Sequence, residues 1–140
     1  MAGEQGWSTV RTWSFPASTA SVGDARQAVT MFLSTGPFHA ADDDVRLMVS
    51  ELTINAVVHA SSAFAVTVCW NERRLRVEVA DSSDAAPRLQ PPTLTEANGR
   101  GLFIVQALAH SWGVEPVGDG KVVWFELLAG EAKAGATVSA

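Results

Sequence analysis

The alternation of apolar and polar positions predicts five β-strands. In the clearest of them Leu75, Val77 and Val79 point to one face, and Arg76 and Glu78 point to the other. β-branched and aromatic residues dominate the remaining candidates. The predicted strands span residues Thr9–Phe15, Ala63–Trp70, Arg74–Ala80, Trp112–Pro116 and Lys121–Leu128. A short turn, residues 71–73, joins the second and third strands into a hairpin with one buried face.

Between these predicted strands lie segments in which apolar residues recur with the spacing of an α-helix. We expect a helix through Ser34 that Ser21 caps, a second from Asp42 to about Ala60, and a short apolar one over Gly101–His110. The second is the clearest, because three aspartates open it and apolar residues recur every three to five positions. The resulting order, β-α-α-β-β-loop-α-β-β, predicts an α+β two-layer sandwich: a mixed, mostly antiparallel sheet backed by about three helices.

Length and composition indicate one globular domain. The chain has 140 residues, of which 47% are hydrophobic, and the domain is expected over 9–129, between a flexible start (1–8) and a flexible tail (130–140). The formal net charge is −5, so the composition gives no sign of the basic surface that nucleic-acid binding requires. The sequence contains no apolar run long enough for a membrane span and no secretory signal, so a cytoplasmic location is expected. Cys69, the single cysteine, is predicted to pack as a small hydrophobe.

The second predicted helix carries the first candidate site. Glu51, Asn55 and His59 lie at positions i, i+4 and i+8 and therefore share a helix face. A carboxylate and an amide one turn apart can hold a hydrated Mg²⁺, or the carboxylate can activate a hydroxyl while the amide oxygen binds the metal. A plain solvated helix face explains the same pattern about as well. His59 is expected to position the helix end rather than to bind a metal.

The second candidate is Asp81, directly after a strand. Its carboxylate can accept a hydrogen bond from an exocyclic amine such as that of adenine, or it can cap the backbone of the following loop. Residues 81–100 then contain three prolines and few apolar residues, which is typical of a lid or of a disordered segment. Lys121, near the start of the last strand, is interpreted as a solvated turn residue, and Trp112 and Trp124 as packing residues.

The third candidate is the segment from Asn98 to Val105, in which Gly99 and Gly101 precede apolar residues. Glycines let backbone N–H groups approach a phosphate closely, and a helix N-terminus favours anions. A flexible loop explains the glycines equally simply. The segment is neither a Walker A sequence nor a complete dinucleotide-binding motif.

Taken together, the three candidates resemble the GHKL (Bergerat-fold) ATPases. The resemblance covers about residues 15–128 and rests on the segments VSELTINAVVHA, LRVEVADSS, NGRGLFIVQALAHSWGV and GKVVWFELL. Within that family the chain looks most similar to the small anti-sigma-factor serine/threonine kinases and related ATP-binding regulatory proteins of actinobacteria. The resemblance implies the histidine-kinase-like ATPase fold, with ATP and Mg²⁺ held between the helical layer and a lid over residues 82–98.

The resemblance also implies residue roles. Asn55 matches the Mg²⁺-binding asparagine, Glu51 the general base and Asp81 the aspartate that recognises the adenine amino group. The residues that match the phosphate-closing segment are Gly99, Arg100, Gly101 and Leu102. The family's adenine motif reads Asp-x-Gly-x-Gly, whereas this chain has Ser82, Ser83, Asp84 and Ala85 after the aspartate, so both glycines are missing.

Three functions follow as hypotheses. The first is an anti-sigma regulatory kinase that binds a sigma factor and phosphorylates a serine or threonine of a STAS-type antagonist, with a homodimer implied by analogy only. The second is a non-catalytic module that sequesters a partner and has a weakened nucleotide site. The third is an ATPase without a protein acceptor. No direct contact with nucleic acid or membrane is expected in any of them.

Overall fold

The computed structural model of the protein describes residues 6–82 and 96–130. For residues 59–60 and 96–101 it describes the backbone alone. Five antiparallel strands form one sheet in the order β1-β2-β3-β5-β4. The strands are β1 (Thr9–Phe15), β2 (Phe64–Trp70), β3 (Arg74–Asp81), β4 (Ser111–Val117) and β5 (Gly120–Leu128). The expected α+β sandwich is therefore confirmed, with antiparallel pairing throughout the described sheet.

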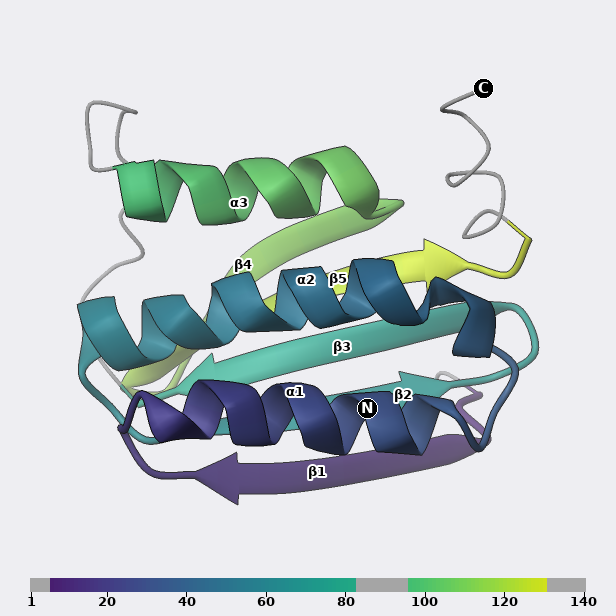
Figure 1. Ribbon diagram of the computed structural model, residues 1–140, viewed down its shortest axis with the longest axis horizontal. Helices are drawn as coiled ribbons and strands as arrows, with labels where there is room; N and C mark the ends of the chain where they lie inside the picture. The colour runs from purple at the N-terminus through teal and green to yellow at the C-terminus, as the bar shows by residue number, and fades with distance from the viewer. Residues whose placement is uncertain (1–5, 83–95, 131–140) are drawn as a thin grey trace.

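Three α-helices cover one face of the sheet (Figure 1). They are α1 (Ala20–Leu33), α2 (Asp42–Ile54) and α3 (Glu96–Leu108), and a short 3₁₀ turn, η2 (His39–Ala41), precedes α2. The chain continues from α2 as one π-helical segment, η3 (Asn55–Ala60). In Figure 1 α2 lies between α1 and α3, so it is the central helix of its layer.

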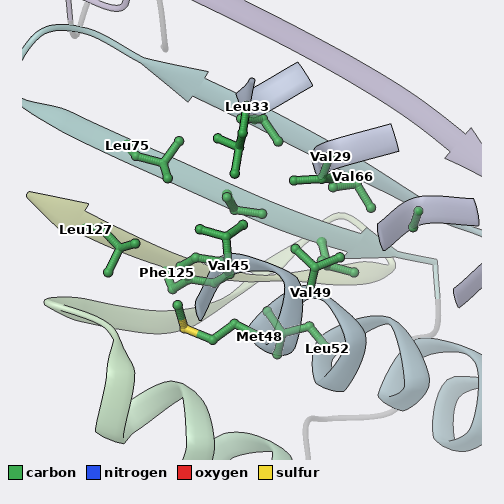
Figure 2. Packing of buried hydrophobic residues seen from close by; sticks show 14 of the residues in the cluster. Val29, Leu33, Val45, Met48, Val49, Leu52, Val66, Leu75, Phe125 and Leu127 are labelled. Carbon is green, nitrogen blue, oxygen red and sulfur yellow. The ribbon is translucent and has the colours of Figure 1, made fainter. Parts of the chain in front are cut away.

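The core fills the space between α2 and the middle of the sheet (Figure 2). Val45, Met48 and Val49 are fully buried on the underside of α2, and they face strand residues such as Leu75 and Phe125, which are also fully buried. Complete burial of an aliphatic side chain contributes about 1.5–3 kcal/mol. This contact fixes both the position of α2 and its rotation about its own axis.

The other face of the sheet carries polar and aromatic side chains. Arg76 donates to Glu78 at 2.7 Å and to Glu126 at 2.9 Å, and its guanidinium lies 4.2 Å from the centre of the Trp124 ring. Cys69 is buried on this face, as expected, and burial together with the neighbouring Glu78 raises the pKa of its thiol to about 12. The thiol therefore stays protonated at neutral pH.

Two sequence-based predictions about the helices are wrong, and a third needs refinement. The helix expected from Asp42 to about Ala60 does end at Ala60, but its α-helical part, α2, ends at Ile54 and its last six residues form the π-helical η3. α3 begins at Glu96, five residues before the expected start. Ser21 does not cap α1: it lies inside the helix and is buried, and Thr19 occupies the N-cap position.

Gly36 and Gly23 form a matched pair for testing the packing. A Cβ at Gly36 would overlap the indole ring of Trp70, which is 5% exposed and packs against Phe32 with ring centres 4.7 Å apart. We expect Gly36→Ala to lower the free energy of unfolding by about 1–3 kcal/mol, because a buried indole must move. Gly23 lies within α1, where an added Cβ meets only the end of the Arg26 side chain at 3.6 Å.

Gly23→Ala should therefore stabilise the protein by up to about 1 kcal/mol through helix propensity. Chemical denaturation of the two variants and the wild type measures both effects. Equal effects of the two substitutions would show that the contact with Trp70 does not restrict residue 36.

Candidate functional site

The rotation of α2 determines where Glu51 and Asn55 lie. The Arg26 side chain on α1 donates to the Ser50 hydroxyl at 3.0 Å, which marks the flank of α2 that faces α1. Each residue of an α-helix turns the side chain by about 100°, so Ser50 and Glu51 lie on either side of the buried face that Val45 and Val49 mark, and Asn55 follows Glu51 one turn later. The flank that carries Glu51 and Asn55 faces α3. Both side chains are half-buried.

Asn55 is the first residue of η3. Its Oδ1 atom is buried, and within the described residues it has no hydrogen-bond partner. Burial of an amide oxygen without a hydrogen-bond partner costs about 1–3 kcal/mol of desolvation. We therefore expect a bound group to interact with this oxygen. A hard cation such as Mg²⁺ takes this kind of oxygen ligand, together with phosphate oxygens and water. The residue therefore fits the expected metal role.

Asn55 is the one protein metal ligand that the sequence predicts. Across residues 6–82 and 96–130 there is no group of three or more His, Cys, Asp or Glu side chains that could hold a metal ion. The side chain of His59 lies outside the described residues.

η3 leads from the end of α2 toward β2, whose first residue, Phe64, is paired with Asp81 at the end of β3. Ser61 terminates η3 in the left-handed conformation, with φ 51°. The hydroxyl of Ser62 then accepts a hydrogen bond from the backbone N–H of Ser82 at 3.1 Å. Ser82 directly follows Asp81, so this bond fixes the direction in which the chain leaves β3. As a result Asn55 and Asp81 belong to two segments that are tied together at the same end of the sheet, on the left in Figure 1.

Asp81 is the last residue of β3, and its side chain is only 4% exposed. Its Oδ2 atom lies 2.7 Å from the Nζ atom of Lys121, whose side chain is 15% exposed. The two residues are directly paired across β3 and β5. The interpretation of Lys121 as a solvated turn residue is therefore wrong: it belongs to β5 and forms a largely buried ion pair.

Gly120 allows this pairing. A Cβ at residue 120 would overlap the backbone carbonyl oxygen of Asp81 and would come within 2.9 Å of the Cα of Ser82. Only a residue without a side chain lets β5 begin so close to β3. The close approach of the two backbones places Lys121 opposite Asp81.

A pocket of about 580 Å³ opens at this end of the sheet. The ends of β1, β2 and β3 supply its lining, including Phe15, Phe64 and Asp81. Glu51 and Asn55 do not line this pocket. The pocket therefore lies beside Asp81 and does not include the flank of α2 that carries Glu51 and Asn55.

The glycine-containing segment lies on the helix next to α2. Gly99, Arg100, Gly101 and Leu102 belong to the first turns of α3, so the two glycines are inside a helix instead of preceding one. Leu102 is partly buried against the core. The N-terminal end of α3 lies at the same end of the molecule as η3 and the end of β3 (Figure 1). Most of the expected lid, residues 83–95, lies outside the described residues.

Sequence reasoning missed two contributors, Lys121 and Ser62. Lys121 carried a usable signal: Lys121, Val123, Phe125 and Leu127 alternate toward the helical layer, as Val77, Val79 and Asp81 do. Each of these two sets of inward-pointing residues ends in a charged residue, so an ion pair between Asp81 and Lys121 is predicted once β3 and β5 are known to be neighbours. Ser62 carried no such signal, because its contact depends on the path of the loop after η3.

Comparison with solved structures supports the fold. The chain is similar to the structure of the RsbU and RsbW domains of Rv1364c from Mycobacterium tuberculosis, with a TM-score of 0.63 and 17% identity. It is also similar to the histidine kinase domain of the blue-light activated histidine kinase from Erythrobacter litoralis EL346, with a TM-score of 0.52 and 20% identity. Each alignment covers 86% of this chain, but only 33% of the first structure and 64% of the second. The chain thus spans about a third of the first structure's length.

A search of curated proteins gave no match. A comparison with protein families matched the histidine kinase-like ATPase domain over residues 15–127. That range runs from the end of β1 into the end of β5 and includes Glu51, Asn55, Asp81 and Lys121. The chain therefore belongs to the histidine kinase-like ATPase domain family.

Proposed function

We propose that this chain binds ATP together with Mg²⁺ and transfers the γ-phosphoryl group to a protein hydroxyl. The observation that carries the proposal is the unpartnered, buried Oδ1 atom of Asn55 on the flank of α2 that faces α3. Asn55 would bind the Mg²⁺ that bridges the ATP phosphates. Asp81, at the end of β3, would accept a hydrogen bond from the 6-amino group of the adenine. Gly99, Arg100, Gly101 and Leu102 would close the phosphate end.

Glu51 is the proposed general base. It lies one helical turn before Asn55 on the same flank, so a carboxylate would stand close to the metal-bound phosphate. Phosphoryl transfer is favoured when a base accepts the proton of the attacking hydroxyl and a divalent cation neutralises the charge on the phosphate. Mg²⁺ would supply that neutralisation, and Glu51 would take the hydroxyl proton of the acceptor.

The resemblance to small anti-sigma kinases supports a regulatory role. In this role the chain binds a sigma factor and phosphorylates a serine or threonine of a STAS-type antagonist, as a cytoplasmic protein and as a homodimer. The structural similarity to a chain with an RsbW domain agrees with this proposal at the level of the fold. Within the described residues, no helix has the length and apolar character needed to span a bilayer.

A second candidate is a non-catalytic module that acts by sequestering its partner. Two observations favour it: Asp81 is already paired with Lys121, and Ser83 and Ala85 stand where the family has glycines. This module would bind its partner without nucleotide. Partner binding that survives loss of the Asn55 amide favours this candidate, whereas binding that requires both ATP and Asn55 favours the kinase.

The metal role of Asn55 predicts that Asn55→Ala abolishes the Mg²⁺-dependent part of ATP binding. The variant loses the one oxygen ligand that the site contributes to the metal, so its affinity for ATP with Mg²⁺ should fall to the value measured with EDTA. Isothermal titration calorimetry under both conditions measures this change. Gln27→Ala is the matched control, because it removes an exposed amide from α1, on the far side of α2. Unchanged Mg²⁺ dependence in Asn55→Ala would contradict the assignment.

The base role of Glu51 predicts a different pattern for Glu51→Gln. ATP binding should stay within about threefold of the wild type, whereas phosphoryl transfer should fall by about 10²-fold or more, because the amide cannot accept the hydroxyl proton. The measurement is transfer of radiolabelled γ-phosphate to STAS-domain proteins from the same genome. Glu72→Gln, in the exposed turn before β3, serves as the control for lost charge. Transfer by Glu51→Gln at the wild-type rate would remove Glu51 from the mechanism.

A further inference from the structure

The ammonium group of Lys121 changes what the Asp81 carboxylate can recognise. Asp81 and Lys121 form a 2.7 Å ion pair in which both side chains are largely withdrawn from water, and Gly120 fixes the register that sets them opposite each other. A ligand that reaches Asp81 therefore meets a hydrogen-bond acceptor, the Asp81 carboxylate, next to a hydrogen-bond donor, the Lys121 ammonium. This inference rests on the proposed function, which directs the 6-substituent of a purine toward Asp81.

A carboxylate alone discriminates strongly between purines at this position. It accepts a hydrogen bond from the 6-amino group of adenine, which is a donor. The 6-oxo group of guanine or hypoxanthine is a hydrogen-bond acceptor. It would face the carboxylate, which is also an acceptor, and both groups would be desolvated without forming a hydrogen bond. A site with only the carboxylate therefore favours ATP over GTP.

The ammonium group of Lys121 removes the reason why a carboxylate alone would prefer 6-amino purines to 6-oxo purines. The Nζ atom has three N–H donors, of which the contact with Asp81 uses one. A second N–H can donate to a 6-oxo group, so that Lys121 bridges two acceptors that would otherwise repel each other. For a 6-amino purine the effect is the reverse, because the ammonium competes with the amino group for the Asp81 oxygens.

We propose that the Asp81–Lys121 pair is a purine-recognition element that accepts both 6-amino and 6-oxo bases. The chain then binds GTP and ITP with affinities comparable to that for ATP. Lys121 is the residue that sets this specificity, and the 2-amino group of guanine plays no part in it.

The experiment compares the Kd values of ATP, GTP and ITP with Mg²⁺ for the wild type and for Lys121→Met, by isothermal titration calorimetry. For the wild type the three values should agree within about tenfold. In Lys121→Met the ratio of GTP to ATP Kd values should rise by about tenfold or more, because one charged hydrogen-bond donor is lost. ITP should follow GTP in both proteins.

Two further variants complete the design. Lys121→Arg keeps a charged donor and should retain the wild-type ratio, whereas Arg73→Met removes a positive charge from the exposed turn at the opposite end of β3 and should also leave it unchanged. The wild-type ratio tests the proposal even where loss of the buried ion pair prevents Lys121→Met from folding.

The outcomes separate this inference from the function on which it rests. Binding of ATP with rejection of GTP and ITP by about 10²-fold or more in the wild type overturns the inference and leaves ATP binding intact. The inference is equally overturned where Lys121→Met keeps the wild-type ratio, or where GTP binds and ITP does not. Absence of binding for all three nucleotides overturns the proposed function itself.

Discussion

The packing of α2 against the middle of the sheet is the constraint on which the rest of the structure depends. Val45, Met48 and Val49 are fully buried there, and their burial leaves α2 no freedom to rotate. One flank of the helix is then bound to α1 through Arg26 and Ser50. The opposite flank, with Glu51 and Asn55, is presented toward α3. The hydrophobic core thus sets the direction of the two residues proposed for the chemistry, although neither belongs to it.

The other end of the site depends on a buried ion pair. Removal of two charges from water costs several kcal/mol per ion, so the contact between Asp81 and Lys121 is no simple source of stability. It persists because Gly120 and the strand register leave each charge facing the other. We propose that the same pair recognises the base of the nucleotide. Under that proposal stability and recognition share one contact, and a ligand at Asp81 must accommodate the ammonium or displace it.

Most of the fold follows from local patterns in the sequence. The alternation from Leu75 to Val79 and the apolar spacing that follows the three aspartates of the first turn of α2 predict their elements correctly, because a single buried face determines each of them. The π-helical segment that begins at Asn55 and the start of α3 at Glu96 were not predicted from the apolar periodicity. For the candidate site, Glu51 and Asn55 are predicted from their spacing, and Asp81 from its place directly after a strand. Lys121 was missed because its importance arises from a neighbour 40 residues away.

The most direct test of this account is calorimetric titration of ATP into the wild type and Asp81→Asn, with Mg²⁺ and with EDTA. Thermal unfolding of both proteins establishes a temperature at which each is folded. The account predicts Mg²⁺-dependent binding to the wild type and a loss of that binding in the variant, because it proposes that Asn55 and Asp81 hold opposite ends of one nucleotide. The absence of binding at millimolar ATP, or equal affinity in the two proteins, would contradict it.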